Sequence, residues 1–314
     1  MNTDPDRALF EQVAADKLLR GGRPVVVMLS GGRDSTCLLD LAVRIAGADA
    51  VSALHINYQL RDTAARDESW CQELCAQLHV ELTVQHARRP SSGNLQAWAR
   101  EVRYKAAAPL AAARGAEVAV GHTATDQVET ILYRLASSPS RRALLGMSVR
   151  DGLLIRPLLA FTREQTGAYC VARGLRWCDD ETNESDAYAR GRVRHGLVPA
   201  LRQIHPGAER NVLALAAILR EEAELLDELV SSVLGGGQQI ELAALRASPP
   251  ALARLVVQRL ADMVNGRPTP GSARRLADIL ALEEKPVAHL DLPGGVRATV
   301  SHGVLSFTST PRER

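Results

Sequence analysis

Short apolar segments alternate with longer amphipathic segments through the first two-thirds of the chain. The short segments are rich in Val, Ile and Leu, as buried strands are, and they occupy residues 25–29, 51–56, 80–84, 118–121 and 153–157. Between them, apolar residues recur at helical spacing over residues 35–46, 64–78, 95–114, 126–135 and 162–173. This alternation predicts an α/β fold, in which a parallel sheet is covered by helices on both faces.

The pattern changes after His205-Pro206-Gly207. Residues 208–233 have the spacing of one long amphipathic helix, and two shorter helices are predicted at 250–264 and 272–282. Three short strands are predicted at the end of the chain, at 287–292, 295–300 and 303–307. We therefore predict two domains: an α/β domain over residues 1–205, and a mainly helical C-terminal domain with a short β tail over residues 206–314.

Composition narrows the class of protein without identifying it. The 314 residues carry a formal net charge of +2, which is too small by itself to indicate a polyanionic partner. The five cysteines are scattered and odd in number, and no C-x-x-C pair occurs, so a disulfide scaffold is not predicted. Neither a signal peptide nor an apolar stretch of membrane-spanning length is found, so we expect no membrane partner and a reducing, cytoplasmic location. The sequence leaves the oligomeric state open, a homodimer included.

The run Ser30-Gly31-Gly32-Arg33-Asp34-Ser35 carries the strongest chemical signal. It lies between a predicted strand and a predicted helix, where glycines allow close backbone approach and the free N–H groups of a helix start attract phosphate. It matches neither of the two commonest nucleotide-binding loops. It resembles instead the S-G-G-x-D-S pyrophosphate loop of enzymes that cleave ATP between its α- and β-phosphates. The structural alternative is a strand–helix turn in which Asp34 caps the helix.

Two weaker groups of polar residues follow. His55 and Asn57 end the second predicted strand, where they could border an adenine or a ribose, or form an ordinary solvated strand end. Arg100, Arg103 and Tyr104 share one face of a predicted helix, because they are three and four residues apart. Such a face could hold an anionic substrate, and a solvated charged face is an equally ordinary outcome.

The segment Gly121-His122-Thr123-Ala124-Thr125-Asp126-Gln127-Val128-Glu129-Thr130 is the second strong signal. It follows a short predicted strand and opens a predicted helix. Asp126 and Glu129 lie on one face of the first turn, where two carboxylates could hold Mg²⁺ or accept a proton from an amine. The structural alternative is a capping box made by these two carboxylates. Capping leaves the neighbouring Gly121, His122, Thr123 and Gln127 without an explanation.

Together these motifs resemble the tRNA(Ile)-lysidine synthetase family of pyrophosphate-loop ATPases. S-G-G-x-D-S, H-x-N, N-x-x-x-x-A-R-x-x-R-Y and G-H-T-x-x-D-Q-x-E-T occur in that order. Further matches are Ile155-Arg156-Pro157-Leu158, Asp180-x-Thr182-Asn183 and Arg190-x-Arg192-x-Arg194-His195, so that the resemblance covers residues 25–204. The chain departs from the family at residues 136–147, where Pro139 stands in a normally glycine-rich loop, and at Gly191, where asparagine is usual.

The resemblance implies a Rossmann-like fold of the adenine nucleotide alpha hydrolase type and a ligation that uses ATP and Mg²⁺. The family joins free L-lysine to C2 of the wobble cytidine in an isoleucine tRNA that bears a CAU anticodon. Adenylation of the base oxygen comes first, which turns a poor leaving group into a good one. The expected partners are therefore lysine and the anticodon loop of tRNA(Ile), and the C-terminal domain is expected to contact the tRNA.

The resemblance also implies roles for individual residues. The nucleotide would be bound by Ser30, Gly31, Gly32, Arg33, Asp34, Ser35, His55, Asn57, Arg100 and Gly121, with Asp34 also the candidate Mg²⁺ ligand. Asp126 and Glu129 would receive the lysine amine. His122 would border the reacting base, and Arg194, ahead of Arg190 and Arg192, would offset charge on the α-phosphate. Candidate contacts to tRNA phosphates are Arg88, Arg89, Arg141, Arg142 and Arg202.

Three other interpretations remain open. A cytidine 2-thiolase of the same superfamily would use C-x-x-C pairs, which this sequence lacks. An NAD or GMP synthetase would act on a small nucleotide with ammonia, without a tRNA. A non-catalytic ATP-binding module would have a mutated catalytic loop, but Asp34, Asp126, Glu129 and Arg194 are all present. The lysidine interpretation itself requires residues 30–35 and the pair Asp126 and Glu129 to open onto one cavity.

Overall fold

The computed structural model describes residues 4–59, 63–88, 90, 95–138, 140–178, 189–266, 268–269, 271–283 and 287–311. Contacts divide the chain into two compact units, Met1–Ala217 and Ile218–Arg314. Each unit has its own sheet and its own hydrophobic core. Over the described ranges, no helix combines the length and the apolar character that crossing a bilayer requires.

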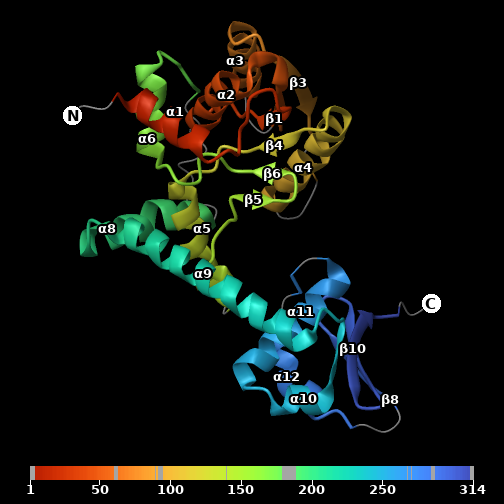
Figure 1. The fold of residues 1–314 in the computed structure, drawn as a ribbon. Coiled ribbons are helices and arrows are strands. Elements are labelled where there is room, and N and C mark those ends of the chain that lie inside the picture. Colours follow the sequence, from red (N-terminus) through yellow and green to blue (C-terminus); the bar gives the residue numbers. More distant parts are fainter. Residues whose placement is uncertain are drawn as a thin grey trace. The chain divides into compact units, whose positions relative to one another are not determined.

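The first unit is built on a six-stranded sheet (Figure 1). Its strands are β1 (Val25–Met28), β2 (Val51–Asn57), β3 (Glu81–His86), β4 (Glu117–Ala119), β5 (Arg150–Asp151) and β6 (Leu154–Ile155). The strand order is β3-β2-β1-β4-β6-β5, in which all neighbours are parallel except β5, which pairs antiparallel with β6 at the edge. This order confirms the predicted parallel α/β fold.

Helices connect and cover these strands. They are α1 (Pro5–Ala15), α2 (Arg33–Ala46), η1 (Ala48–Ala50), α3 (Ala64–Gln77), α4 (Leu95–Arg114), α5 (Ala124–Ser137), η2 (Arg141–Ala143), α6 (Arg163–Ala172), α7 (Ala189–Arg192), the π-helical turn η4 (Val193–Leu197) and α8 (Val198–Ile204). The pattern of apolar residues did not predict α1, which buries only Leu9 and Val13. It also did not predict the π-helical turn, because a π turn adds one residue without changing the apolar content.

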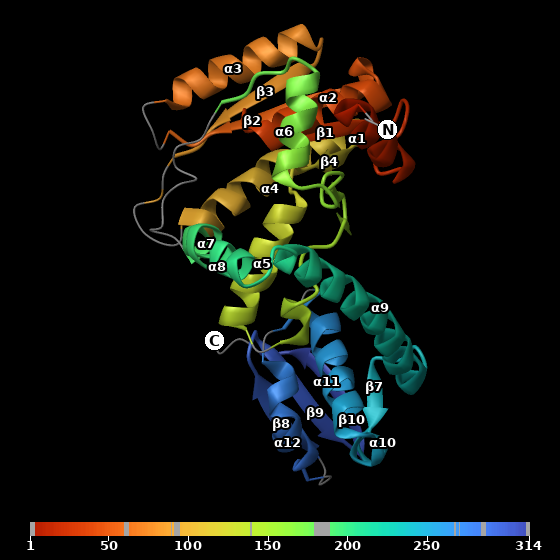
Figure 2. The same ribbon diagram turned by 90° about the vertical axis from the view of Figure 1, so that its left-hand side faces the viewer.

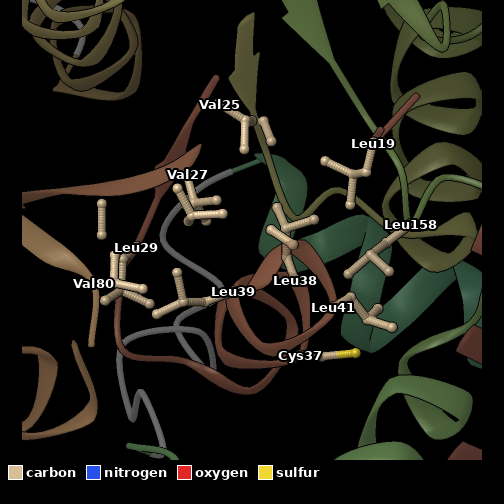
Figure 3. Close-up of a cluster of buried hydrophobic side chains, with 14 of the residues drawn as sticks. Leu19, Val25, Val27, Leu29, Cys37, Leu38, Leu39, Leu41, Val80 and Leu158 are labelled. Carbon is tan, nitrogen blue, oxygen red and sulfur yellow. The ribbon is translucent and has the colours of Figure 1, made fainter. Parts of the chain in front are cut away.

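One face of the sheet packs against α1, α2, α3 and α6. Side chains of a strand alternate between its two faces, so Val25 and Val27 of β1 point to this side, as does the following Leu29. They meet Leu38 and Leu39 of α2 in a buried cluster that Figure 3 shows in close-up. This packing fixes α2 against β1 and thereby fixes the loop between them.

The opposite face packs against α4, and Figure 2 shows α3 and α4 on opposite sides of the sheet. Val26 and Met28 of β1 belong to a cluster with Ala107 and Ala111 of α4. These alanines are small, so the helix can lie close to the strands. Met28 also reaches the carboxyl end of the sheet, where it lines the cavity described below.

A third, smaller cluster decides where the first unit ends. Val212 and Leu213 of α9 (Ala208–Leu234) pack against buried side chains of α5, η4 and α8, which are Val128, Leu132, Val193 and Val198. The first turns of α9 therefore belong to the first unit. For this reason the structure divides between Ala217 and Ile218, inside α9, instead of at the turn near His205.

The second unit combines helices with a four-stranded antiparallel sheet. After the rest of α9 come β7 (Gln239–Glu241), α10 (Leu242–Ala247), α11 (Pro250–Asn265), η5 (Ser272–Arg275), α12 (Leu276–Leu280), β8 (Val287–Leu292), β9 (Val296–Ser301) and β10 (Val304–Ser309). The sheet order is β7-β10-β9-β8. The predicted helices and the β tail are confirmed, and β7 is an additional strand that the sequence pattern did not show.

Candidate active site

The carboxyl ends of β1, β2 and β4 open onto a cavity of about 760 Å³. The chain leaves β1 toward β2 on one side and returns to β4 on the other, so the cavity lies at the topological switch point, where α/β sheets bind ligands. Both strong motifs of the sequence line it: Ser30, Gly32, Arg33, Asp34 and Ser35 from the first, and Gly121, His122 and Asp126 from the second. The two motifs therefore share one cavity.

Residues 30–35 form a loop that its own hydroxyl groups hold together. Ser35 Oγ donates to the Gly32 carbonyl at 2.8 Å and accepts from the Ser30 backbone N–H at 3.2 Å. Gly31 has a φ of +84°, a conformation that glycine adopts without strain. The N-cap of α2 is Gly32 and not Asp34, and no side chain caps the helix. The first N–H groups of α2 can therefore receive an anion.

The second motif approaches this loop so closely that there is no room for a side chain at Gly121. A Cβ on Gly121 would lie 3.1 Å from the backbone carbonyl of Asp34 and 3.2 Å from the backbone nitrogen of Ser35. Those atoms are backbone, so a rotamer change could not relieve the contact. Gly121 thus allows the end of β4 to pack against the start of α2.

Asp34 lies where the loop meets α6. Thr166 Oγ1 donates to Asp34 Oδ1 at 2.5 Å, while Arg163 Nε lies 3.4 Å from Oδ2. Burial raises the pKa of Asp34, and the Thr166 hydrogen bond and the Arg163 charge offset only part of that rise. Thr166 and Arg163 were not indicated by any sequence motif, since both are far from residues 30–35 along the chain.

Asp126 caps α5 and faces the same cavity. Its Oδ2 accepts the Thr123 backbone N–H and the Thr123 hydroxyl, both at 2.8 Å, which makes a capping box between Thr123 and Asp126. Arg163 Nη2 lies 3.0 Å from Oδ1. Burial alone would raise the pKa of Asp126, but Arg163 and the two Thr123 donors outweigh it and hold that pKa below its usual value. The capping box expected from Asp126 and Glu129 is thus shifted by one turn, and Glu129 has no part in it.

Glu129 is 3% exposed, is paired with Arg194 and, unlike Asp126, does not line the cavity. The expectation that both carboxylates open onto the cavity therefore holds for Asp126 alone. Arg194 Nε donates to Glu129 Oε1 at 2.6 Å, and Nη2 donates to Oε2 at 2.9 Å. The same Nη2 lies 3.8 Å from Asp126 Oδ1. Arg194 is carried by η4, and π-helical turns are frequent at functional sites. Arg190 points elsewhere and donates to Thr130 Oγ1 at 3.1 Å.

His122 lines the cavity and is held from behind by Arg156, which is 3% exposed. Arg156 Nε donates to His122 Nδ1 at 3.3 Å, so the proton of the neutral ring lies on Nε2. Burial lowers the pKa of His122 to about 4, and the charge of Asp126 offsets only part of that effect. His122 is therefore a neutral hydrogen-bonding group at neutral pH.

Gln127, which lies inside the second motif, has a structural role: its side chain bonds to the backbone of Met147. Its Nε2 donates to the Met147 carbonyl at 2.9 Å and its Oε1 accepts the Met147 N–H at 2.6 Å. A Cβ on Gly146, whose φ is +68°, would lie 2.6 Å from Gln127 Oε1. Gln127 thus anchors the end of the segment 136–147, where the sequence departs from the family pattern. Pro139 itself lies outside the described residues.

Besides Gly31, whose neighbours in the loop line the cavity, three predicted nucleotide-site residues do not line it. His55 is buried and its Nδ1 lies 2.9 Å from the Leu29 carbonyl, while Asn57 Nδ2 donates to Glu68 at 2.7 Å. Both side chains point to the face of β2 that is opposite to the cavity, because Leu54 and Ile56 take the cavity side. Arg100 stacks over the Tyr104 ring at 4.9 Å and lines a separate pocket, while Arg103 lines the cavity.

Some predicted site residues are not described by the structure, and one predicted RNA contact is paired with a carboxylate instead. Arg89, Asn94, Asp180, Thr182 and Asn183 lie outside the described residues. Of the arginines expected to contact RNA phosphates, Arg202 is paired with Glu209 at 2.5 and 3.0 Å on the surface. Further cavity residues that the motifs did not single out as site residues are Tyr58, Ala99, Val120, Trp177, Cys178 and His195.

Comparison with known proteins identifies the family of the chain. Residues 4–201 match a family model described as the PP-loop domain. The chain is 33% identical over 313 residues to a tRNA(Ile)-lysidine synthase of Geobacter sulfurreducens, an alignment that covers 92% of this chain and 66% of that protein. It is 34% identical over 302 residues to the tRNA(Ile)-lysidine synthase of Thermus thermophilus, covering 93% of this chain and 58% of that protein. The chain thus spans 58% to 66% of the length of these relatives.

A solved structure supports the fold. The U34-tRNA thiolase NcsA from Methanococcus maripaludis, determined with its 4Fe-4S cluster, superimposes with a TM-score of 0.57. The identity is 17%, and the alignment covers 68% of this chain and 78% of that one. At this identity the likeness concerns the fold alone.

Proposed function

The chain belongs to the PP-loop family and, within it, to the tRNA(Ile)-lysidine synthases, and on that premise we propose that it joins free lysine to C2 of the wobble cytidine in an isoleucine tRNA in the cytoplasm. ATP would supply the energy and leave as AMP and pyrophosphate. The observation that carries this proposal is the shared cavity, in which a phosphate-binding loop faces the carboxylate of Asp126.

The cavity offers complementary walls for ATP. Residues 30–35 and the uncapped start of α2 would bind the triphosphate through backbone N–H groups and the serine hydroxyls. The apolar side chains of Met28, Leu54 and Ile56 would pack against the adenine ring, because the flat faces of an aromatic base are weakly hydrated. Arg33, which lines the same wall, would contact a phosphate oxygen.

The chain fits Mg²⁺ as an ion shared with the substrate. No group of three or more His, Cys, Asp or Glu side chains in the described parts of the chain is placed to hold a metal by itself. Mg²⁺ is usually held by one or two carboxylates together with substrate phosphates, and Asp34 supplies such a carboxylate beside the loop. The ion would neutralise phosphate charge there.

The other half of the cavity suits an amine and a base. A carbonyl oxygen on cytosine is a poor leaving group, so it must first attack the α-phosphorus and acquire AMP; the amine can then attack C2 and AMP departs. Asp126 would hold the lysine ammonium and receive its proton, and Glu129 would keep Arg194 in place beside it. Arg194 would offset the negative charge that grows on the α-phosphate. His122, being neutral, would hydrogen-bond the base from Nε2 without adding charge.

The wobble base must leave its stack to enter such a cavity, which favours a single-stranded anticodon loop as the substrate. Arg103, Arg194 and Arg33 line the cavity and give it positive charge. We further propose that the second unit, which carries none of the chemical motifs, contacts the body of the tRNA. Because phosphate contacts release counterions, the affinity for tRNA should fall steeply as salt rises.

The decisive experiment incubates the pure protein with ATP, Mg²⁺, lysine and an isoleucine tRNA that bears a CAU anticodon. Mass spectrometry of the wobble nucleoside should show cytidine converted to lysidine, with release of one pyrophosphate and one AMP for each lysine incorporated. A tRNA with uridine at the wobble position is the matched control and should not be modified. Pyrophosphate release that is unaffected by both tRNA and lysine would contradict the proposal and favour a small-nucleotide synthetase.

A further inference from the structure

One guanidinium joins the two halves of the cavity. Arg163, the first residue of α6, places Nε 3.4 Å from Asp34 Oδ2 and Nη2 3.0 Å from Asp126 Oδ1. Asp34 is the carboxylate expected beside the triphosphate, and Asp126 is the one expected beside the amine. A single side chain therefore contacts both acids.

Arg163 is not fully satisfied in this position. Its Nε is buried and has no hydrogen-bond acceptor, because the 3.4 Å contact with Asp34 is not aligned as a hydrogen bond. A buried donor without an acceptor is destabilising. The Arg163 side chain lines the cavity, while its backbone N–H is fixed to Thr125 Oγ1 at 3.2 Å. An acceptor that entered the cavity could therefore draw the side chain without moving α6.

Arg194 differs from Arg163 in this respect. Its Nε and Nη2 donate to the two carboxylate oxygens of the buried Glu129 at 2.6 and 2.9 Å, which makes a bidentate pair. Removing Arg194 from Glu129 would leave a buried carboxylate without its counter-ion, which is costly. Of the two guanidinium groups at Asp126, Arg163 is thus the one that can leave more easily.

We propose that Arg163 is a positioning residue that couples nucleotide binding to amine binding. Without nucleotide, its guanidinium lies against Asp126, in the place that the lysine ammonium would take. When a triphosphate fills the loop, its oxygens offer Arg163 Nε the acceptor that it lacks, and Asp126 is left to the amine of lysine. The inference rests on the proposed function, because it requires both substrates to bind in this cavity.

Coupling between two bound ligands is reciprocal. If the nucleotide raises the affinity for lysine by some factor, lysine must raise the affinity for the nucleotide by the same factor. Couplings of this kind are commonly 5- to 150-fold, and we expect about tenfold here. Loss of the Arg163 side chain should remove the coupling mainly by tightening lysine binding in the absence of nucleotide, since the competing internal cation is gone.

Equilibrium dialysis of radiolabelled lysine tests this, with and without Mg²⁺ and the non-cleavable analogue α,β-methylene-ATP. The wild-type chain should bind lysine about tenfold more tightly with the analogue, and Arg163→Ala should show a change of less than about twofold. Arg163→Lys should recover part of the coupling, because an ammonium is a point charge that cannot span both carboxylates. Arg163→Gln, which keeps a polar side chain of similar length, serves as the second variant if Arg163→Ala does not fold by circular dichroism.

Arg150→Ala is the matched control, because Arg150 pairs with Glu117 at the sheet edge and does not line the cavity. It should retain the full coupling. Full coupling in the Arg163 variants, or none in a wild-type chain that binds lysine and makes lysidine, would overturn the inference alone. A wild-type chain that binds no lysine under either condition and makes no lysidine would overturn the proposed function together with it.

Discussion

The two halves of the cavity are held in shape by different interactions, backbone conformation in one and pairs of charged side chains in the other. The phosphate loop, residues 30–35, depends on backbone geometry: Gly31 has a φ of +84°, and Ser30 and Ser35 bond to each other and to the loop. The opposite half, which we call the ionic half, consists of Asp126, Glu129 and Arg194 with Arg163 and His122. The serine hydroxyls of the loop hold much of its conformation, and among its side chains Asp34 bonds to Thr166 of another element, whereas each charged member of the second half is paired with a residue from another element.

The difference predicts how each half responds to damage. A backbone site should lose ligand affinity when its conformation is strained, but little stability. The ionic half should lose stability and function together, because removing one partner leaves a buried charge without compensation.

Removal of Arg194 should have the largest effect. Arg194→Ala leaves the carboxylate of Glu129, 3% exposed, without its counter-ion, and we expect a loss of about 3 kcal/mol in the free energy of unfolding. Lysidine formation should fall by roughly a thousandfold, as it does when a group that stabilises transition-state charge is removed. Urea unfolding and single-turnover assays measure the two effects.

Arg202→Ala is the control for this prediction. Arg202 also makes a two-bond fork with a carboxylate, that of Glu209, but on the exposed surface of the first unit. Such a pair contributes less than about 1 kcal/mol. If Arg194→Ala cost no more stability than Arg202→Ala, the ionic half would not depend on its partners as the comparison states.

Acid should weaken the ionic half selectively. Burial lowers the pKa of His122 to about 4 in the folded chain, against about 6.5 in the unfolded chain, so between these values only the unfolded chain binds the proton. Stability from this group is therefore present above pH 6.5 and is lost as pH falls. From pH 7 to pH 5 the loss should be about 2 kcal/mol.

The measurement compares urea unfolding of the wild type and His122→Asn across this pH range. The variant should have a flatter dependence on pH, by about that amount. His289→Asn, in the second unit, controls for the loss of an imidazole as such. A slope in His122→Asn equal to that of the wild type would show that the neutral ring held by Arg156 does not contribute to the acid response.

The same contrast explains what the sequence could predict. The strand–loop–helix around Ser30 is local, so apolar periodicity and two glycines sufficed to predict it. The contact of Asp34 with Thr166, 132 residues away, depends on the packing of α6 against α2 and leaves no local pattern. For His55 the strand was predicted correctly, but the prediction ignored the alternation of side chains, which turns His55 away from the cavity.

The ionic half was predicted only in part, for a related reason. Asp126 and Glu129 were correctly placed on one helical face, but the helix was expected to start two residues later than it does. That shift exchanges their roles: Asp126 closes the capping box with Thr123, and Glu129 is free of it and pairs with Arg194 instead. Helix starts are the least certain part of a sequence pattern, because apolar spacing does not mark the cap.

The smallest expected effect on stability comes from the phosphate loop, where Gly31→Ala forces a side chain into a left-handed conformation. The backbone strain should cost about 1 kcal/mol. A Cβ at this position would also lie 3.3 Å from Cys71 Sγ.

Gly47→Ala is the control: Gly47 has a φ of +89°, lies at the other end of α2, and has open space around its Cβ position. Both variants should therefore lose stability, but only Gly31→Ala should weaken binding of α,β-methylene-ATP, by about tenfold or more, because only there does strain move the N–H groups that we propose bind the phosphates. Equal nucleotide affinity in the two variants would mean that the loop does not bind the triphosphate through its backbone, and the contrast between the two halves of the cavity would then be lost.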